Sequence, residues 1–250
     1  MTQNKVYIYG KHALTEALMN TPRAVKKIYL ANSVEDKALR TLVQKSGVPM
    51  AVLSGGTMPG EVSKDATHQG VIGVISLSDL MIPYDVFISK MKPDASKALV
   101  LLNEIQDPHN VGAVIRSAAA FGIAGVLIPE HNQAPVTGAV VKVSAGMAFR
   151  IPLISIGNSN NTLRDLKAQG FWIYGLAGEA GAHNIVTEKF DAPSVFVVGN
   201  EGEGLREKTR ECCDILLAIP MHPQCESLNA AASVAVTLYA WSAQHPEALK

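Results

Sequence analysis

Beyond residue 97 the chain alternates short apolar runs with stretches of helical periodicity, and this alternation constrains its fold more than any other feature. The apolar runs lie at 99–102, 125–128, 151–154, 171–176, 195–198 and 215–219, and the helical patterns at 110–121, 136–147, 161–169, 204–212 and 227–243. Strands that helices cover on both faces read as continuous apolar runs. The order therefore predicts an α/β domain with a parallel sheet, in which ligands bind beyond the carboxyl ends of the strands.

Residues 6–76 predict a second, smaller α/β unit. Helical patterns alternate there with strand-like runs, at 12–19, 27–30, 35–46, 48–53 and 68–75. The segment that follows is rich in Ser, Asp, Pro and Lys, and Pro83 and Pro93 interrupt any regular structure. We therefore predict three parts: an N-terminal domain at 1–78, a linker at 79–97 and a C-terminal domain at 98–250.

Composition favours a globular protein of the cytoplasm. Hydrophobic residues make up 48% of the 250 residues, which is enough for a substantial core. No apolar run approaches the roughly 18 residues of a membrane span, and the N-terminus lacks the apolar block of a signal peptide. The 3 cysteines, two of them adjacent at Cys212 and Cys213, do not suggest a disulfide framework. We expect reduced thiols and no membrane contact.

The net charge is zero, but basic residues are concentrated near the N-terminus. Residues 1–78 hold 9 Lys and Arg against 5 Asp and Glu, and Arg23, Lys26 and Lys27 form the densest cluster. Two interpretations stay open for this excess: an ordinary solvated surface, or a weak phosphate-binding face.

A helix that follows the first apolar run of the C-terminal domain carries an unusual arginine. Pro108 disfavours a helical Asp107, so we expect Asn110 to be the N-cap and Gly122 to end the helix. At about 100° per residue, Arg116 points away from a stripe that faces the sheet, formed by Val111, Val114, Ile115 and Ala118. Arg116 is either an ordinary exposed arginine or a group that binds a phosphate or a partner chain.

A glycine-rich turn follows the apolar run at 195–198. Its glycines, at 199, 202 and 204, have the order G-x-x-G-x-G, whereas a dinucleotide fingerprint reads G-x-G-x-x-G. Glu201 and Glu203 would also repel a pyrophosphate. The turn therefore disfavours a NAD site and favours a ligand with a positive centre, although Glu203 could simply stabilise the start of the next helix.

The last loop joins the apolar run at 215–219 to an alanine-rich helix that begins at Ser227-Leu228-Asn229. Taken alone, Ser227 is an ordinary N-cap. His222 and Cys225 could be imagined as metal ligands or as a nucleophile pair, but no second Cys/His pair completes a tetrahedral set. We predict no metal.

Three segments together resemble the motifs of the SpoU (TrmH) family of RNA ribose 2′-O-methyltransferases, namely Asn110-x-Gly112-x-x-x-Arg116, Gly199-Asn200-Glu201-Gly202-x-Gly204-Leu205, and Ile219-Pro220-Met221 followed by Ser227-Leu228-Asn229. The segments 9–14 and 68–72 resemble the small substrate-binding domain found in the 23S ribosomal RNA guanosine subgroup. The family often has a small residue after Ile-Pro-Met, whereas this chain has His222-Pro223-Gln224-Cys225-Glu226.

The resemblance implies two domains: an N-terminal L30e-like α/β substrate-binding domain and a C-terminal SPOUT α/β domain with a trefoil knot. It also implies a homodimer with the active site at the subunit interface. The cofactor would be S-adenosylmethionine, bound by the loops after the late strands through Ala177, Gly199, Ile219 and Leu228.

The implied reaction is an in-line methyl transfer to a ribose hydroxyl, in which positioning supplies much of the rate. We expect Arg116 from one subunit to hold the substrate phosphate and assist deprotonation in the other subunit's site. Asn110 would fix Arg116 and the ribose, while Glu201, Ser227 and Asn229 would orient them. No metal is needed.

Three other functions remain in view. Within the methyltransferases, transfer RNA is the alternative substrate to ribosomal RNA. A non-catalytic RNA-binding or ribosome-assembly protein would keep the fold without the chemistry, but Arg116, Glu201 and Asn229 argue against it. A nucleotide-dependent oxidoreductase is disfavoured by the order of the glycines.

Overall fold

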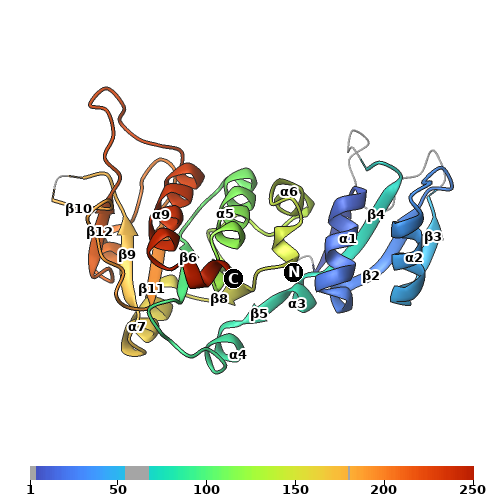
Figure 1. Ribbon diagram of the computed structural model, residues 1–250, viewed down its shortest axis with the longest axis horizontal. Helices are drawn as coiled ribbons and strands as arrows, with labels where there is room; N and C mark the ends of the chain where they lie inside the picture. Colours follow the sequence, from blue (N-terminus) through green and yellow to red (C-terminus); the bar gives the residue numbers. More distant parts are fainter. Residues whose placement is uncertain (1–3, 54–67, 180) are drawn as a thin grey trace. The chain divides into compact units, whose positions relative to one another are not determined.

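The computed structural model describes residues 4–53, 68–179 and 181–250, and its contacts divide the chain into two compact units (Figure 1). Unit 1 comprises Met1–Met81 with Val136–Arg150, and unit 2 comprises Ile82–Pro135 with Ile151–Lys250. Part of the predicted basic N-terminal domain, at 1–3 and 54–67, lies outside the described residues. The predicted boundaries at 78 and 97 stay a prediction.

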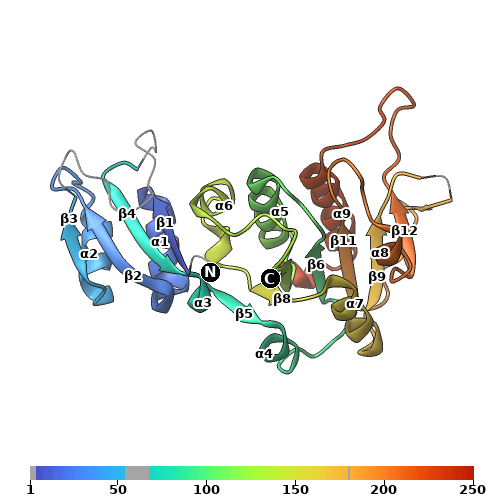
Figure 2. The same cartoon turned by 180° about the vertical axis from the view of Figure 1, so that it is seen from behind.

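In its described residues, unit 1 holds a sheet of 4 strands in the order β1-β4-β2-β3, with α1 and α2 on one face (Figures 1 and 2). Strand β4 is antiparallel to β1 and β2, whereas β3 is parallel to β2. The elements are β1 (Lys5–Tyr9), α1 (Lys11–Asn20), η1 (Pro22–Ala24), β2 (Val25–Leu30), α2 (Lys37–Ser46), β3 (Met50–Val52), β4 (Val71–Ser76) and α3 (Leu77–Leu80).

Helix α2 illustrates how the sequence determines where a helix of unit 1 begins and ends. The Asp36 carboxylate accepts a hydrogen bond from Leu39 N at 3.0 Å, which satisfies an amide at the start of the helix. Gly47 ends the helix with φ 66, a left-handed conformation that suits glycine. The apolar residues Leu39 and Val43 lie one turn apart and are both buried.

Unit 1 also includes α6 (Gly138–Val143) and the short η2 (Met147–Phe149). A helix was predicted at 136–147, and α6 is shorter than this. Ala145 and Gly146 adopt left-handed φ values of 51 and 78, which are incompatible with a continuing α-helix. Arg150, just past η2, forms a salt bridge with the buried Glu16 of α1 at 2.6 Å. This pair ties the end of the segment to α1.

In unit 2 the sheet, counted over the described residues, has 8 strands in the order β10-β12-β9-β11-β6-β7-β8-β5. From β10 to β8, every neighbouring pair is parallel. The predicted parallel sheet is thus confirmed. The strands are β5 (Met81–Pro83), β6 (Ala98–Leu102), β7 (Gly125–Pro129), β8 (Leu153–Ile156), β9 (Trp172–Leu176), β10 (His183–Asn184), β11 (Ser194–Val198) and β12 (Ile215–Ala218).

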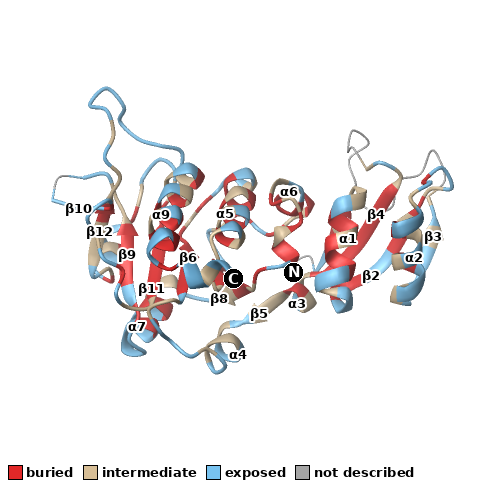
Figure 3. Ribbon diagram, viewed as in Figure 1, coloured by how far each residue is buried: buried red, intermediate tan, exposed pale blue. Residues whose placement is uncertain are grey.

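Helices cover both faces of this sheet (Figures 1 and 2). Alternate residues of β6 and β11, such as Leu99 and Val195, pack with Leu163 of α7 in one buried cluster. Helices α5 and α9 pack together on the other face, and the central strands are buried throughout (Figure 3). The helices are α4 (Tyr84–Ile88), α5 (Pro108–Ala120), α7 (Ser159–Ala168), α8 (Glu207–Arg210), α9 (Ala230–Gln244) and η3 (Pro246–Leu249).

Two predicted N-caps lie a few residues away from the observed ones. Helix α5 begins at Pro108, with the Asp107 carboxylate accepting from His109 N at 2.8 Å, so Asn110 is not the cap. Proline is well suited to the first helical turn because its φ is already helical. Helix α9 is capped by Asn229 in place of Ser227, since Asn229 Oδ1 accepts from Ala231 N and Ala232 N. The side chains of Asn110 and Ser227, both predicted site residues, are therefore not used as helix caps.

Candidate functional site

Three loops at the carboxyl ends of the strands meet through a chain of hydrogen bonds. Asn229 Nδ2 donates to Asn110 Oδ1 at 2.9 Å, and Asn110 Nδ2 donates to Glu201 Oε1 at 2.9 Å. The three residues are separated by about 90 and 30 positions along the chain, yet they form one polar cluster. The structure therefore brings together three of the five predicted catalytic residues, and we call them the amide–carboxylate chain.

The Glu201 carboxylate at the centre of this chain is held ionised. Burial opposes its charge, but hydrogen bonds from Asn110 and from the backbone N–H of Gln106 and Asp107 outweigh that effect and lower the pKa of Glu201. Because only the ionised form accepts all these bonds, the carboxylate stabilises the junction of the first and second loops at neutral pH.

A pH dependence follows from the lowered pKa of Glu201. An acid whose pKa is depressed on folding stabilises the protein above its ordinary pKa of 4.5, and this contribution is lost as the pH falls through the folded-state value. The difference in melting temperature between the wild type and Glu201→Gln should be constant from pH 7 to about pH 5 and shrink below the ordinary pKa. Thermal unfolding across that range measures it. A difference that stays constant to pH 3 would contradict the assignment.

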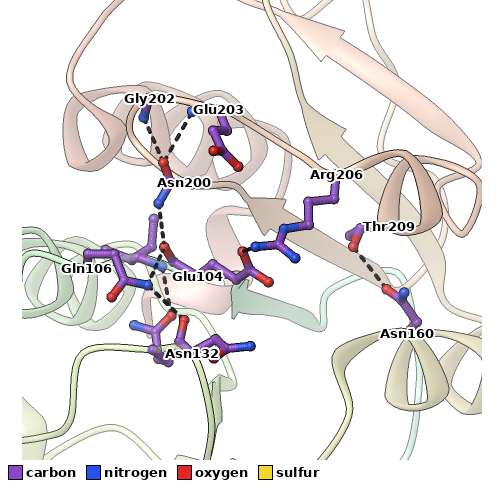
Figure 4. A network of polar contacts seen from close by, with 11 residues as sticks. Glu104, Gln106, Asn132, Asn160, Asn200, Gly202, Glu203, Arg206 and Thr209 are labelled. Carbon is purple, nitrogen blue, oxygen red and sulfur yellow. Dashed lines mark hydrogen bonds and ion pairs between the residues drawn. The ribbon is translucent and has the colours of Figure 1, made fainter.

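The glycine-rich turn closes on itself. Asn200 and Gly204 exchange two backbone hydrogen bonds of 3.0 Å each, and the Asn200 side-chain oxygen accepts from Gly202 N and Glu203 N (Figure 4). A Cβ at Gly199 would lie 2.3 Å from the backbone carbon of Gly204, and Gly204 itself has φ 67. The first and last glycines are thus required by the closed turn itself.

Glu104 links this turn to the first loop. Its carbonyl accepts from Asn200 Nδ2 at 2.9 Å and from Gln106 Nε2 at 3.2 Å, while its carboxylate pairs with Arg206 at 2.8 Å (Figure 4). Glu104 has φ 65, a left-handed conformation that is strained for a residue with a side chain. Backbone strain is thus located where two loops of the site are fixed to each other.

The strain at Glu104 can be measured with two substitutions. Both Glu104→Gly and Glu104→Ala lose the exposed pair with Arg206, but only glycine relieves the left-handed strain. Glu104→Gly should therefore be more stable than Glu104→Ala by about 1 kcal/mol, as measured by urea unfolding. Equal stabilities would show that the left-handed conformation costs nothing at this position.

Beside the chain lies an open cavity of about 430 Å³ at the ends of β9, β11 and β12. Apolar side chains, such as Leu176, Val198 and Leu217, form part of its wall, and the glycine turn forms another part. All four residues predicted to bind the cofactor lie on it, namely Ala177, Gly199, Ile219 and Leu228. The site therefore combines an apolar surface with a closed glycine-rich turn.

Charged side chains around the cavity are mostly acidic. Glu179, Glu201, Glu203 and Glu226 line it, and Arg210 is the one basic side chain among the described lining residues. Arg210 is itself paired with Glu179. The cavity thus favours a ligand with an apolar body and a positive centre.

Comparison with known proteins identifies the family. The model of the SpoU rRNA methylase family matches residues 97–239, and a model for RNA 2′-O ribose methyltransferase substrate binding matches residues 7–81. The chain belongs to the SpoU rRNA methylase family. Its predicted two-part SPOUT architecture is thereby confirmed, whereas the knot stays a prediction.

Curated relatives span nearly the whole chain of this SpoU family member. The 23S rRNA (guanosine-2′-O-)-methyltransferase RlmB of Shewanella oneidensis is 32% identical over 93% of this chain and 94% of its own. The RlmB of Vibrio vulnificus is 35% identical over the same shares, 93% and 94%. The predicted resemblance to the 23S guanosine subgroup is thus confirmed.

Solved structures show the same fold. The SpoU methyltransferase AviRb of Streptomyces viridochromogenes, in complex with AdoMet, has a TM-score of 0.81 and 22% identity, covering 98% of this chain and 92% of its own. An rRNA methyltransferase of Sinorhizobium meliloti has a TM-score of 0.79 and 20% identity, covering 95% and 86%.

The other two predicted catalytic residues lie apart from the amide–carboxylate chain. Ser227 lines the cavity and is exposed. Arg116 is exposed on α5 opposite the buried stripe, as predicted, but it is not among the residues that line the cavity. Six residues of helix separate it from Asn110, a rise of about 9 Å. The hydrogen bonds of Asn110 go to Glu201 and Asn229, so the expected contact with Arg116 does not occur within one chain.

Sequence reasoning missed Glu179 and Arg210, which line the cavity as an ion pair. Glu179 could have been predicted from the sequence. It follows the predicted strand at 171–176, so it was expected to lie at the carboxyl end of that strand. Arg210 carried no such signal, because its contact with Glu179 spans 31 positions.

The described residues offer neither a metal site nor a membrane-spanning helix. They contain no group of three or more His, Cys, Asp or Glu side chains that could hold a metal ion. His222 Nδ1 accepts from Gln224 N at 3.3 Å, so that ring is engaged in a local turn. None of the described helices is long and apolar enough to cross a membrane.

Proposed function

We propose that the chain transfers the methyl group of S-adenosylmethionine to the ribose 2′-hydroxyl of a guanosine in 23S ribosomal RNA. The observation that carries this proposal is the cavity with its apolar wall and acidic rim, which adjoins the chain of Asn110, Glu201 and Asn229. Relatives of 32% and 35% identity, named for this reaction, support the guanosine and the RNA.

The residues around the cavity fit S-adenosylmethionine. Leu176, Val198 and Leu217 offer an apolar wall for an adenine, and the glycines of the closed turn let its backbone approach a ligand closely. The carboxylates of the rim complement a sulfonium, which supplies an electrophilic methyl group when the cofactor is bound. Two glutamates in the turn would repel a nucleotide pyrophosphate, so the oxidoreductase alternative is disfavoured again.

Asn110, Glu201 and Asn229 would order the substrate side of the site. Glu201 fixes the Asn110 amide, and Asn229 donates to the Asn110 oxygen while it caps α9. Each side chain therefore has a defined orientation before any substrate binds, which reduces the entropic cost of aligning the 2′-oxygen with the methyl donor. Ser227, on the cavity wall, is placed to contact a bound ligand.

Arg116 would act on the substrate in the site of a second subunit. An arginine is a poor base, because its pKa lies above about 12, but it can bind a phosphate and stabilise the negative charge that develops on the 2′-oxygen. Its exposure and its distance along α5 from Asn110 favour a role outside its own cavity. A homodimer would bring it to the partner's cavity.

An exposed apolar patch on α9 supports such a dimer. Val236 is 41% exposed and Tyr239 is 63% exposed, and the Tyr239 ring packs edge-on against Phe121 at the end of α5. A second copy of the chain would cover this patch, which would otherwise expose large apolar side chains to water. The family's trefoil knot is proposed for the same C-terminal region.

The N-terminal unit would bind the RNA. Its sequence match to a substrate-binding domain and its excess of basic residues favour a polyanionic partner in the cytoplasm.

Mapping 2′-O-methyl groups in ribosomal and transfer RNA from cells that lack this chain tests the proposed methylation of 23S ribosomal RNA. We expect one guanosine of 23S RNA to lose its methyl group. A lost mark in transfer RNA, or unchanged RNA, would contradict the proposal.

A further inference from the structure

The Arg210–Glu179 pair has no role in the amide–carboxylate chain, although both side chains line the cavity. Arg210 ends α8, and its backbone is fixed by hydrogen bonds from Arg210 N to Arg206 O and from Cys213 N to Arg210 O. Glu179 follows β9, and nothing lies within 4 Å of a Cβ built on the preceding Gly178. The arginine is thus on a fixed support, and the carboxylate lies next to a residue with open space around it.

The Arg210–Glu179 pair is too exposed to contribute much to the stability of the fold. The side chains of Arg210 and Glu179 are 27% and 40% exposed, and solvent-accessible ion pairs contribute little to folding. What the contact does fix is the direction of the carboxylate. A glutamate that lines a cavity and is held by an arginine is oriented for a hydrogen-bond donor of a ligand.

The hydrogen bonds around the cavity indicate which end of the cofactor Glu179 would meet. Asn110 follows β6 and Glu201 follows β11, whereas Glu179 follows β9, which lies on the side of β11 away from β6. The reacting methyl group has to face Asn110 and the substrate. Glu179 and Arg210 line the cavity as a separate pair, with no hydrogen bond to Asn110, Glu201 or Asn229 among the described residues, so we assign them to the adenosine part of the cofactor. A carboxylate that accepts from ribose hydroxyls is a common way to bind an adenosine.

We propose that Glu179 binds the ribose hydroxyls of the methyl donor and that Arg210 is a positioning residue that holds the Glu179 carboxylate in place. This inference rests on the proposed function, because it assigns part of the same cavity. Neither residue touches the reacting atoms, so both act on cofactor affinity and leave the methyl-transfer step unchanged.

Calorimetric titration of the full-length protein tests the proposal with two probes. One is S-adenosylmethionine, and the other is 5′-methylthioadenosine, which keeps the ribose hydroxyls but lacks the amino acid part and the charge. Glu179→Gln should weaken both ligands by about tenfold, the effect of losing hydrogen bonds to a charged group. Arg210→Met should weaken both less, and the double variant should be no weaker than Glu179→Gln alone.

Kinetics and controls separate positioning from a general structural effect. In methylation assays Arg210→Met should raise the KM for S-adenosylmethionine several-fold without changing kcat, and Arg210→Lys should restore part of the affinity. Lys208→Met, an exposed cation on the same helix that does not line the cavity, should bind both ligands as the wild type does. Matching thermal unfolding curves would exclude a folding defect in the variants.

Four results would overturn the proposal. Wild-type affinity in Glu179→Gln would show that Glu179 does not contact the ribose. Wild-type affinity in Arg210→Met would show that Arg210 does not position Glu179. Additive losses in the double variant would show that the two residues act independently. A loss for S-adenosylmethionine but not for 5′-methylthioadenosine would place the pair at the amino acid end. If the wild type itself binds neither ligand, the proposed function fails first.

Discussion

Replacing Arg116 with alanine should lower kcat for ribose methylation at least about 100-fold, the cost of losing one preorganised group that stabilises a developing negative charge. The effect should fall on kcat because the cavity that would bind the cofactor contains no atom of Arg116. Its side chain is exposed, so the variant should unfold at the wild-type temperature. Transfer of tritium-labelled methyl groups to 23S RNA measures the rate.

The control for this prediction is Arg164→Ala. Arg164 is an exposed arginine on α7, and its bond to Asn161 is local, so its loss should leave the rate unchanged. Calorimetry should show wild-type affinity for S-adenosylmethionine in both variants. A rate for Arg116→Ala within about threefold of the wild type would remove Arg116 from the mechanism.

Replacing Gly199 with alanine should destroy the glycine turn. The added Cβ would lie 2.3 Å from the Gly204 backbone carbon and 2.6 Å from Leu205 N, and backbone atoms there cannot move aside without opening the turn. We expect a loss of about 1–3 kcal/mol in the free energy of unfolding, as for other overpacked sites, and at least tenfold weaker binding of S-adenosylmethionine. Urea unfolding and calorimetry measure the two effects.

Gly202→Ala is the matched substitution in the same turn. The nearest atom to its Cβ would be Asn200 Oδ1 at 3.6 Å, an ordinary contact, and Gly202 has no left-handed φ. This variant should keep both the stability and the cofactor affinity of the wild type within about twofold. Equal behaviour of the two variants would mean that the closed turn is not what the cofactor requires.

The sequence predicted the parts of the fold that depend on local pattern. Every strand predicted from an apolar run beyond residue 97 is a strand of the sheet, and the stripe predicted to face the sheet on α5 is fully buried. These features follow from periodicity, because a buried face has to repeat with the helix or the strand. Strand β1 was missed, although buried residues alternate regularly in it with less buried ones.

Features that depend on distant contacts could not be predicted in the same way. The caps at Asp107 and Asn229 were missed because several polar residues compete near each helix start. The left-handed conformation of Glu104 has no local signal, since it is stabilised by Asn200 and Gln106. The segment at 136–150 reads as part of the C-terminal domain, yet its contacts, such as Arg150 with Glu16, place it in the other unit.

For the site, the resemblance supplied the residues and the structure supplied their arrangement. Asn110, Glu201 and Asn229 form one hydrogen-bonded chain, and all four predicted cofactor residues line one cavity. Their roles stay predictions, as does the role of Arg116, which lies away from its own cavity and is proposed to act in the cavity of a second chain.

Mixing two inactive variants tests this composite site most directly. Arg116→Ala lacks the arginine, and Glu201→Gln lacks the charge at the centre of the amide–carboxylate chain, so we expect each variant alone to be inactive. If Arg116 serves the partner's cavity, a mixed dimer has one intact site, and unfolding and refolding the two variants together should restore methylation of 23S RNA to about one quarter of the wild-type rate for equal amounts, by random pairing. A mixture as inactive as either variant alone would contradict a site shared between subunits.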